Sequence, residues 1–259
     1  LTLNAGGSMA SANYTVAATA TLNANGALAS TANVTANGAV NFGGTTGGTA
    51  RTQALGTLAI GSGVTVSITH SAFAFTPTIL KPNTTTFADS TAKIDLSDNT
   101  FITNGTAAGA LGLIQAGQIF SSEIADPNKA IGYIDLSGAD AGNYETRYTL
   151  KGDTNLDGAV GVGDLGALAT SYGVTGGMSW ANGDFNQDHN VNVADLGALA
   201  TNYGTQLSTS SAVATSLAIV ASGGGGGGGA AVPEPASVSL LGIGALTLAS
   251  GRRRRRLAD

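Results

Sequence analysis

Residues 152–173 read GDTNLDGAVGVGDLGALATSYG and residues 183–204 read GDFNQDHNVNVADLGALATNYG, so one 22-residue unit occurs twice at an offset of 31 positions. An internal repeat of this kind marks two copies of one supersecondary unit. In each copy an acidic loop leads directly into an apolar stretch with helical spacing. The repeat therefore predicts a small module of two loop–helix units.

Both loops fit the twelve-residue calcium loop, in which oxygen atoms from positions 1, 3, 5, 7, 9 and 12 surround the ion. Position 7 gives only its backbone carbonyl, so its side chain can vary. The predicted metal ligands are Asp153, Asn155, Asp157, Ala159 and Asp164 in the first copy, and Asp184, Asn186, Asp188, Asn190, Asn192 and Asp195 in the second. We therefore expect two Ca²⁺ ions as cofactors.

Three positions distinguish these loops from each other or from the usual pattern. Position 12 is Asp rather than Glu in both, which requires each helix to start closer to the ion. Position 9 is Asn192 in the second loop and Gly161 in the first, so the second site is expected to be better filled. Position 6, however, is His189 in the second loop, where the first has Gly158. A left-handed non-glycine residue costs about 1–2 kcal/mol, which weakens the second site.

The charges of the repeat also indicate a metal site. All the acidic residues between Gly152 and Gly204 occupy predicted ligand positions, and this segment has no Lys or Arg to pair with them. Three carboxylates in one loop repel each other unless a cation neutralises them. The alternative is a pair of Asp-rich turns that cap two helices, but such a turn needs one Asp rather than a spaced set.

An amphipathic helix is predicted after each loop, with apolar residues at i, i+3, i+4 and i+7. These residues are Leu165, Leu168, Ala169 and Tyr172, repeated as Leu196, Leu199, Ala200 and Tyr203. Gly173 and Gly204 follow the helices, as C-terminal caps do. We expect the two apolar stripes to be buried against each other and Trp180, between the copies, to cover the core of the module.

Residues 151–205 resemble a type I dockerin, which has two calcium loops with Asp at position 12, each followed by one helix. The resemblance implies calcium binding and a cohesin-like receptor domain as partner. Dockerins recognise cohesins through residues just before position 12, and the matching residues here are Val162, Gly163, Val193 and Ala194. Cellulosomal members commonly have Ser-Thr in these places, so the resemblance supports calcium binding more strongly than cohesin binding.

The C-terminal residues 232–259 combine Pro233, Glu234 and Pro235 with a short apolar run and five arginines. A stable membrane span needs about 20 apolar residues, so this shorter run suits a transient membrane insertion. The arginines would stay on the cytoplasmic side. The segment is similar to the PEP-CTERM sorting tail, which implies recognition by an exosortase and export to the cell envelope surface or extracellular space. An ordinary C-terminal anchor or a buried helix is the alternative.

Composition limits the remaining partners. Without residues 252–259 the chain has 15 acidic and 6 basic residues, a net charge of −9, which does not favour binding to nucleic acid. Residues 206–231 include seven consecutive glycines and are rich in Ser and Ala. This composition predicts a flexible linker between the calcium module and the tail.

The first 150 residues are rich in Ala, Thr, Asn and Gly, and short apolar segments end in Gly turns. The motifs LNAGGSM, LNANGAL, VNFGGT and LAIGSGV start at residues 3, 22, 40 and 58, a period of 18 or 19 residues. This period is near one turn of a β-solenoid, and the motifs resemble autotransporter-associated β-strand repeats. Residues 1–75 are therefore predicted to form a right-handed β-solenoid, with a β-sandwich or a disordered linker as alternatives.

Residues 76–150 are predicted to be a β-rich region that caps the solenoid, because an open solenoid end must be closed. A helix is expected within residues 107–120. A last strand around Tyr144, Tyr148 and Leu150 leads into the calcium module. The predicted fold class is thus mainly β, with a small α module of two calcium loop–helix repeats.

Groups that could perform catalysis are scarce. The chain has no Cys and only two histidines, His70 and His189, which excludes thiol catalysis and does not favour a His-based zinc site. Most acidic residues outside the loops lie in turn contexts, where Asp closes a turn by itself. We expect no enzymatic activity in these residues.

These features predict an exported bacterial surface or extracellular-matrix protein with a structural or adhesive role. The alternative is the C-terminal part of a secreted polysaccharide-degrading enzyme, whose catalytic domain precedes Leu1 and whose dockerin joins it to an extracellular complex. The chain begins without a signal peptide although its tail needs export, which favours a longer protein. A calcium-dependent carbohydrate binder would need more exposed aromatic residues than Tyr14, Phe42, Phe73 and Phe75.

Overall fold

The computed structural model describes residues 1–4, 7–43, 50–70 and 77–207. The sorting tail and all but the first two residues of the predicted linker lie outside the described residues.

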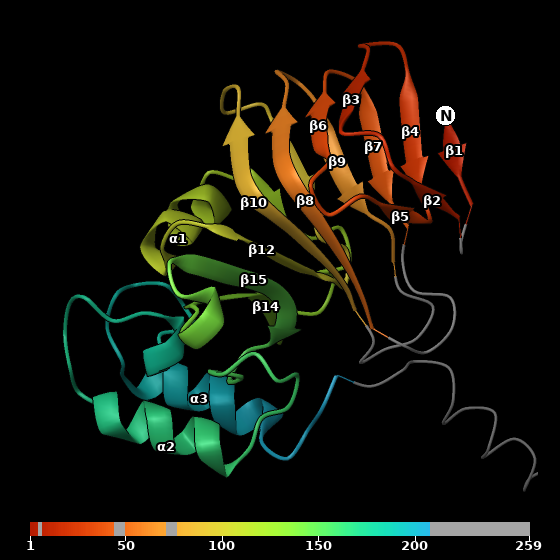
Figure 1. Cartoon of the computed structure of the whole chain (residues 1–259). Helices are drawn as coiled ribbons and strands as arrows, with labels where there is room; N and C mark the ends of the chain where they lie inside the picture. Colours follow the sequence, from red (N-terminus) through yellow and green to blue (C-terminus); the bar gives the residue numbers. More distant parts are fainter. Residues whose placement is uncertain (5–6, 44–49, 71–76, 208–259) are drawn as a thin grey trace, which may run out of the picture. The chain divides into compact units, whose positions relative to one another are not determined.

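The chain winds between two sheets and forms a β-solenoid of about four turns (Figure 1). The first sheet contains β1 (Thr2–Leu3), β4 (Thr21–Ala24), β7 (Ala39–Phe42), β9 (Thr65–Ile68), β11 (Lys93–Asp95) and β13 (Ile119–Phe120). The second contains β3 (Asn13–Val16), β6 (Asn33–Ala36), β8 (Arg51–Ile60), β10 (Thr78–Phe87) and β12 (Thr100–Asn104). A separate pair is formed by β2 (Ser8–Met9) and β5 (Ala27–Leu28). All these neighbours pair in parallel, which confirms the predicted solenoid.

Alternating burial explains how segments of small residues form these strands. In β3, β4, β6 and β7 every second side chain is buried. Because the strands pair in register, the buried side chains stack into continuous apolar columns between turns. One such column follows the first sheet through Leu22, Val40, Val66, Ile94 and Ile119.

The length of a turn varies along the solenoid. Leu22 pairs with Val40, as the period of 18 predicts, but Val66 pairs with Ile94, 28 residues further on. The motif at Leu58 was expected to continue the row of Leu22 and Val40. Leu58 instead lies in β8 of the second sheet and pairs with Val34, because β8 is a ten-residue strand that departs from the early pattern.

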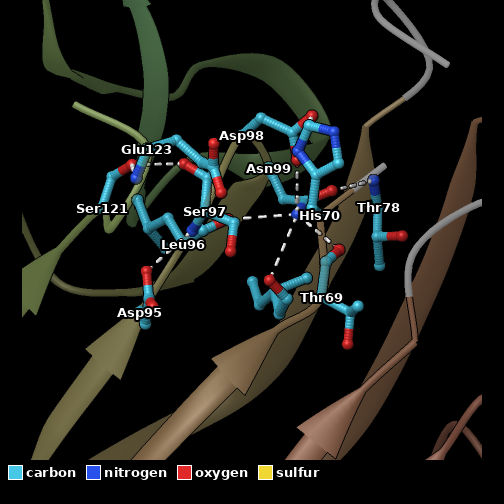
Figure 2. Close-up of polar contacts among 11 residues, drawn as sticks. Thr69, His70, Thr78, Asp95, Leu96, Ser97, Asp98, Asn99, Ser121 and Glu123 are labelled. Atoms are coloured by element: carbon cyan, nitrogen blue, oxygen red, sulfur yellow. Dashed lines mark hydrogen bonds and ion pairs between the residues drawn. The ribbon is translucent and has the colours of Figure 1, made fainter. Parts of the chain in front are cut away.

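A buried asparagine fixes one of the bends between the sheets (Figure 2). The side-chain amide of Asn99 donates to the carbonyls of Ile68, Thr69 and Leu96 at 3.4, 3.0 and 3.1 Å. Its Oδ1 accepts from the Thr78 N–H at 2.8 Å. Asn99 is fully buried, its two amide hydrogens are shared among these carbonyls, and its Oδ1 satisfies the Thr78 N–H.

The parallel pairing ends where two antiparallel strands join the second sheet. In Figure 1, β15 (Asn143–Leu150) lies next to β12, and β14 (Lys129–Asp135) lies next to β15. The predicted helix is α1 (Ala107–Gln115), which Thr106 caps. It ends before residue 120 because Gly117 takes a positive φ of 68° and β13 follows. A 3₁₀ turn, η1 (Gly138–Asp140), connects β14 and β15.

The repeat forms two helices, α2 (Val162–Ser171) and α3 (Val193–Asn202), with a 3₁₀ turn, η2 (Trp180–Asn182), between them. Their apolar stripes are narrower than predicted. Leu168 and Leu199 are 1 % exposed, but Tyr172 and Tyr203 are each 50 % exposed. Both helices end before the tyrosine, whose backbone is extended, so the side chain leaves the helical face.

Candidate metal centre

The two predicted calcium loops share one backbone conformation. Position 4 has a positive φ in both, with 59° at Leu156 and 63° at Gln187. Position 6 also has a positive φ, with 88° at Gly158 and 66° at His189. His189 therefore adopts the left-handed conformation that was expected to strain the second loop. The same local fold forms from two different sequences.

The first carboxylate of each loop is held by backbone amides of its own loop. The oxygens of Asp153 accept from the N–H groups of Asp157 and Gly158 at 3.1 and 2.9 Å. In the second copy, Asp184 accepts from the N–H groups of Asp188 and His189 at the same two distances. These bonds wrap each loop around its position-1 carboxylate, and Asp153 also accepts from the Thr149 hydroxyl of β15.

The position-12 carboxylates close the loops from the first turn of each helix. Asp164 accepts from the N–H groups of Thr154 and Gly161, both at 2.8 Å. Asp195 accepts from the N–H groups of Phe185 and Asn192 at 2.9 and 3.0 Å. Each Asp is the third residue of its helix. From there its side chain, although one methylene shorter than that of Glu, reaches the N–H at position 2 of its loop.

Four of the carboxylates are buried without a cationic partner. Asp153, Asp184 and Asp195 are 0 % exposed and Asp164 is 3 % exposed. The ion pairs among the described residues, His70–Asp98 and Lys81–Asp140, lie outside both loops. Burial raises the pKa of Asp153 to about 6, and the nearby carboxylates of Asp157 and Asp164 act in the same direction. Burial also raises the pKa of Asp184.

Positions 3 and 5 lie on the exposed side of each loop. The Asn155 amide donates to Asp157 at 2.9 Å, and the Asn186 amide donates to Asp188 at 3.0 Å. Within the described ranges, no three His, Cys, Asp or Glu side chains converge closely enough to hold a metal ion. In each loop the carboxylates of positions 5 and 12 both lie near enough to that of position 1 to raise its pKa.

The donor set nevertheless fits a hard cation. Each loop offers three carboxylates, one side-chain amide and one backbone carbonyl, all of which are oxygen donors that suit Ca²⁺ rather than Zn²⁺. Asn192, predicted as the position-9 ligand, has another role, because its Oδ1 accepts from the Ala194 N–H at 2.8 Å and caps α3.

The two copies are interlocked rather than independent. In the first loop, Val160 exchanges backbone bonds with Gly204 and Thr205, which follow the helix of the second copy. In the second loop, Val191 exchanges bonds with Gly173 and Val174, which follow the helix of the first copy. Each loop is thus completed by the other copy, a relation that the repeat alone did not reveal.

The predicted partner-binding residues are accessible. Val162 and Val193, the first residues of α2 and α3, are 78 % and 72 % exposed. Gly163 and Ala194, which follow them, are also exposed. Each copy in addition exposes the tyrosine after its helix, Tyr172 or Tyr203. The sequence pattern missed these tyrosines because their helical spacing continues past the point where the helix ends.

His70 belongs to a different part of the chain. Figure 2 shows its ring beside Asp98, with 3.1 Å between Nδ1 and the carboxylate. The His70 side chain is 60 % exposed, so it lies at the surface. Other acidic residues outside the loops serve turns, since Asp89, Asp95 and Asp126 each accept from the N–H two residues later.

A comparison with protein-family models matches residues 231–256 to the PEP-CTERM protein-sorting motif. This motif is recognised by exosortase and marks proteins that are exported and sorted to the cell surface or extracellular space. The chain is therefore an exported protein. The same comparison finds no dockerin family and no autotransporter repeat family.

Neither the curated proteins nor the solved structures contain a match to the chain. In the part of the chain that the structure describes, no helix has the length and apolar character needed to cross a membrane.

Proposed function

We propose that this exported protein binds two Ca²⁺ ions, one in the loop at residues 153–164 and one in the loop at residues 184–195. The supporting observation is the burial of four carboxylates in two loops of the same conformation, without a Lys or Arg partner among the described residues. Burying an unpaired carboxylate costs several kcal/mol. A divalent cation bound in each loop offsets that cost, which couples calcium to the stability of the module.

We propose further that the calcium-loaded module is a dockerin-like docking unit for a cohesin-like receptor domain. Val162 and Val193 support this proposal, because large apolar side chains are exposed at the same position of both copies. In dockerins these places contact the cohesin, so a docking role requires that the side chains there be exposed, as they are. The solenoid then serves as a structural or adhesive stalk at the cell surface, and these residues have no catalytic role.

Isothermal calorimetry of the full chain tests the calcium proposal. We expect two binding events per chain and an increase in the helical circular dichroism signal when Ca²⁺ replaces a chelator. Asp153→Asn and Asp184→Asn should each remove one event. Glu123→Gln, which changes an exposed acid outside the loops, is the control and should leave both events unchanged. Absence of heat and of any helical change would exclude the calcium proposal.

Docking is tested separately with a purified type I cohesin domain as the probe. Binding of the full chain should require Ca²⁺ and should weaken at least tenfold in the double variant Val162→Asp, Val193→Asp. A chain that binds two Ca²⁺ ions but no cohesin domain would contradict the docking role and leave the calcium role intact.

A further inference from the structure

Two side chains from outside the first calcium loop bind its backbone carbonyls, and a third, the Thr149 hydroxyl of β15, donates to the Asp153 carboxylate. Arg147 Nη1, from β15, donates to the Leu156 carbonyl at 2.6 Å. Trp180 Nε1, from η2, donates to the Asp153 carbonyl at 2.6 Å. Asp153 is position 1 and Leu156 is position 4 of the loop, so these bonds fix the backbone on which the first ligands are mounted.

Close packing around Trp180 makes this support rigid. The indole is fully buried, and its ring centre lies 6.2 Å from that of Tyr133 and 5.2 Å from that of Phe185. Strand β14 approaches so closely that a Cβ on Gly132 would lie 2.3 Å from the Leu156 side chain and 2.8 Å from Trp180 Nε1. The Trp180 indole and the Leu156 side chain therefore cannot move freely once the fold has formed.

The second loop has no equivalent support. Among the described residues, no side chain donates to the carbonyl of Asp184 or to that of Gln187, which hold positions 1 and 4. The contacts of this loop with the segment before it are local, such as the bond from the Asp184 N–H to the Ser179 carbonyl at 3.1 Å. The repeat is symmetric in sequence but its surroundings are not.

We propose that Arg147 and Trp180 are positioning residues that preform the first loop, so that it binds Ca²⁺ more tightly than the second loop and fills first. This inference rests on the proposed calcium function. The sequence predicted that the second loop would be better filled, because Asn192 stands at its position 9. Asn192 instead caps α3, so the inference reverses that order of binding. Because linkage is reciprocal, Ca²⁺ in the first loop also stabilises β14 and β15.

Two effects of Arg147 oppose each other. Its positive charge repels a cation, whereas its hydrogen bond holds the loop in one conformation. The carbonyl that it binds belongs to position 4, which is not a ligand, so the charge does not contact the ion directly. Partners of this kind, which orient ligands from outside, typically change metal affinity by about 10–100-fold. We therefore expect orientation to dominate over repulsion.

The experiment is a calcium titration of the full chain in two backgrounds. Asp184→Ala leaves the first loop as the only intact site, and Asp153→Ala leaves the second. In the Asp184→Ala background, Arg147→Met should lower the Ca²⁺ affinity roughly tenfold. The same substitution in the Asp153→Ala background should change the affinity by less than about twofold. Trp180→Phe, which replaces the indole with a smaller phenyl ring and removes the N–H donor, is the second variant and should show the same selectivity.

The outcomes separate the two proposals. Loss of affinity in the first-loop background alone supports positioning. An equal loss in both backgrounds indicates a general structural role and overturns the inference, as does a gain in affinity, which would show that charge repulsion dominates. Absence of calcium binding in the unmodified chain would overturn the proposed function and this inference with it. Circular dichroism in chelator confirms that each variant folds.

Discussion

The backbone at position 6 is the same in both loops, but only one loop has the residue that suits it. His189 has a φ of 66°, a conformation that disfavours side chains with a Cβ, whereas Gly158 adopts 88° without strain. His189→Gly should therefore raise the free energy of unfolding by about 1 kcal/mol, which is the strain relieved less the entropy that glycine loses on folding. Urea unfolding in chelator measures the change.

Thr175→Gly is the control for this substitution, because Thr175 is exposed and its φ is not positive. It should lower the stability by up to about 1 kcal/mol. If His189→Gly destabilises the protein as much as the control does, the strain at His189 is not significant.

Asn99 provides the second prediction at this scale. Replacing it with alanine leaves the Thr78 N–H and the Ile68 carbonyl without their buried partner. Each unsatisfied buried group costs about 1–3 kcal/mol, so Asn99→Ala should destabilise the protein by about 3 kcal/mol in thermal or urea unfolding. Asn41→Ala is the matched control. It removes a half-buried bond to Asn23 and should cost less than about 1 kcal/mol, and an equal cost would refute the special role of Asn99.

At the scale of elements, β14 buries Tyr133, and β15 buries Tyr144 and Tyr148. Burial raises the pKa of both Tyr133 and Tyr144 to about 12. Between pH 10 and pH 12 the unfolded chain loses these protons while the folded chain keeps them, so stability is complete below pH 10 and falls as the pH rises towards 12. Urea unfolding as a function of pH should show this decrease.

The variants that test the pH effect are matched. Tyr133→Phe combined with Tyr144→Phe should flatten the decrease above pH 10. Tyr172→Phe combined with Tyr203→Phe changes two exposed tyrosines and should leave the decrease unchanged. A decrease that persists in the first double variant would assign it to other groups.

The success of sequence reasoning differed between the elements. The solenoid strands and α1 were predictable because alternation and helical spacing are local properties. The longer turns after residue 43 were not, because β8 pairs with β6 rather than with β7, and pairing between distant strands has no local signal. The exposure of Tyr172 and Tyr203 was missed for a related reason, since the extended backbone after each helix depends on bonds made by the other copy.

In the candidate site, too, local features were predictable from the sequence and contacts between distant residues were not. Spacing indicated that the carboxylates of positions 1 and 12 belong to one loop, and hydrogen bonds between nearby residues close each loop around them, whereas their role as metal ligands stays a prediction. The burial of Trp180 was also expected. The bonds from Trp180 and Arg147 to the first loop could not be predicted, because they join residues whose proximity depends on how the repeat packs against β14 and β15.

At the scale of the molecule, the interlocked copies imply that the module gains or loses its structure as one unit. Neither loop is complete without the segment that follows the other helix. The apolar columns of the solenoid, in contrast, involve no residue of either loop. Calcium should therefore control the stability of the module much more strongly than that of the first solenoid turns.

Removal of calcium tests this difference, because the chain contains one tryptophan and Trp180 lies in the module. Chelator should shift the Trp180 emission to longer wavelength as the indole becomes hydrated, and should accelerate amide hydrogen exchange in α2 and α3. Exchange in β4 and β7 should stay slow, because their bonds lie within the solenoid. Mg²⁺ in place of Ca²⁺ is the control and should restore less protection, since it demands a stricter octahedral geometry. Uniform acceleration across both regions would show that the chain unfolds as a single unit instead.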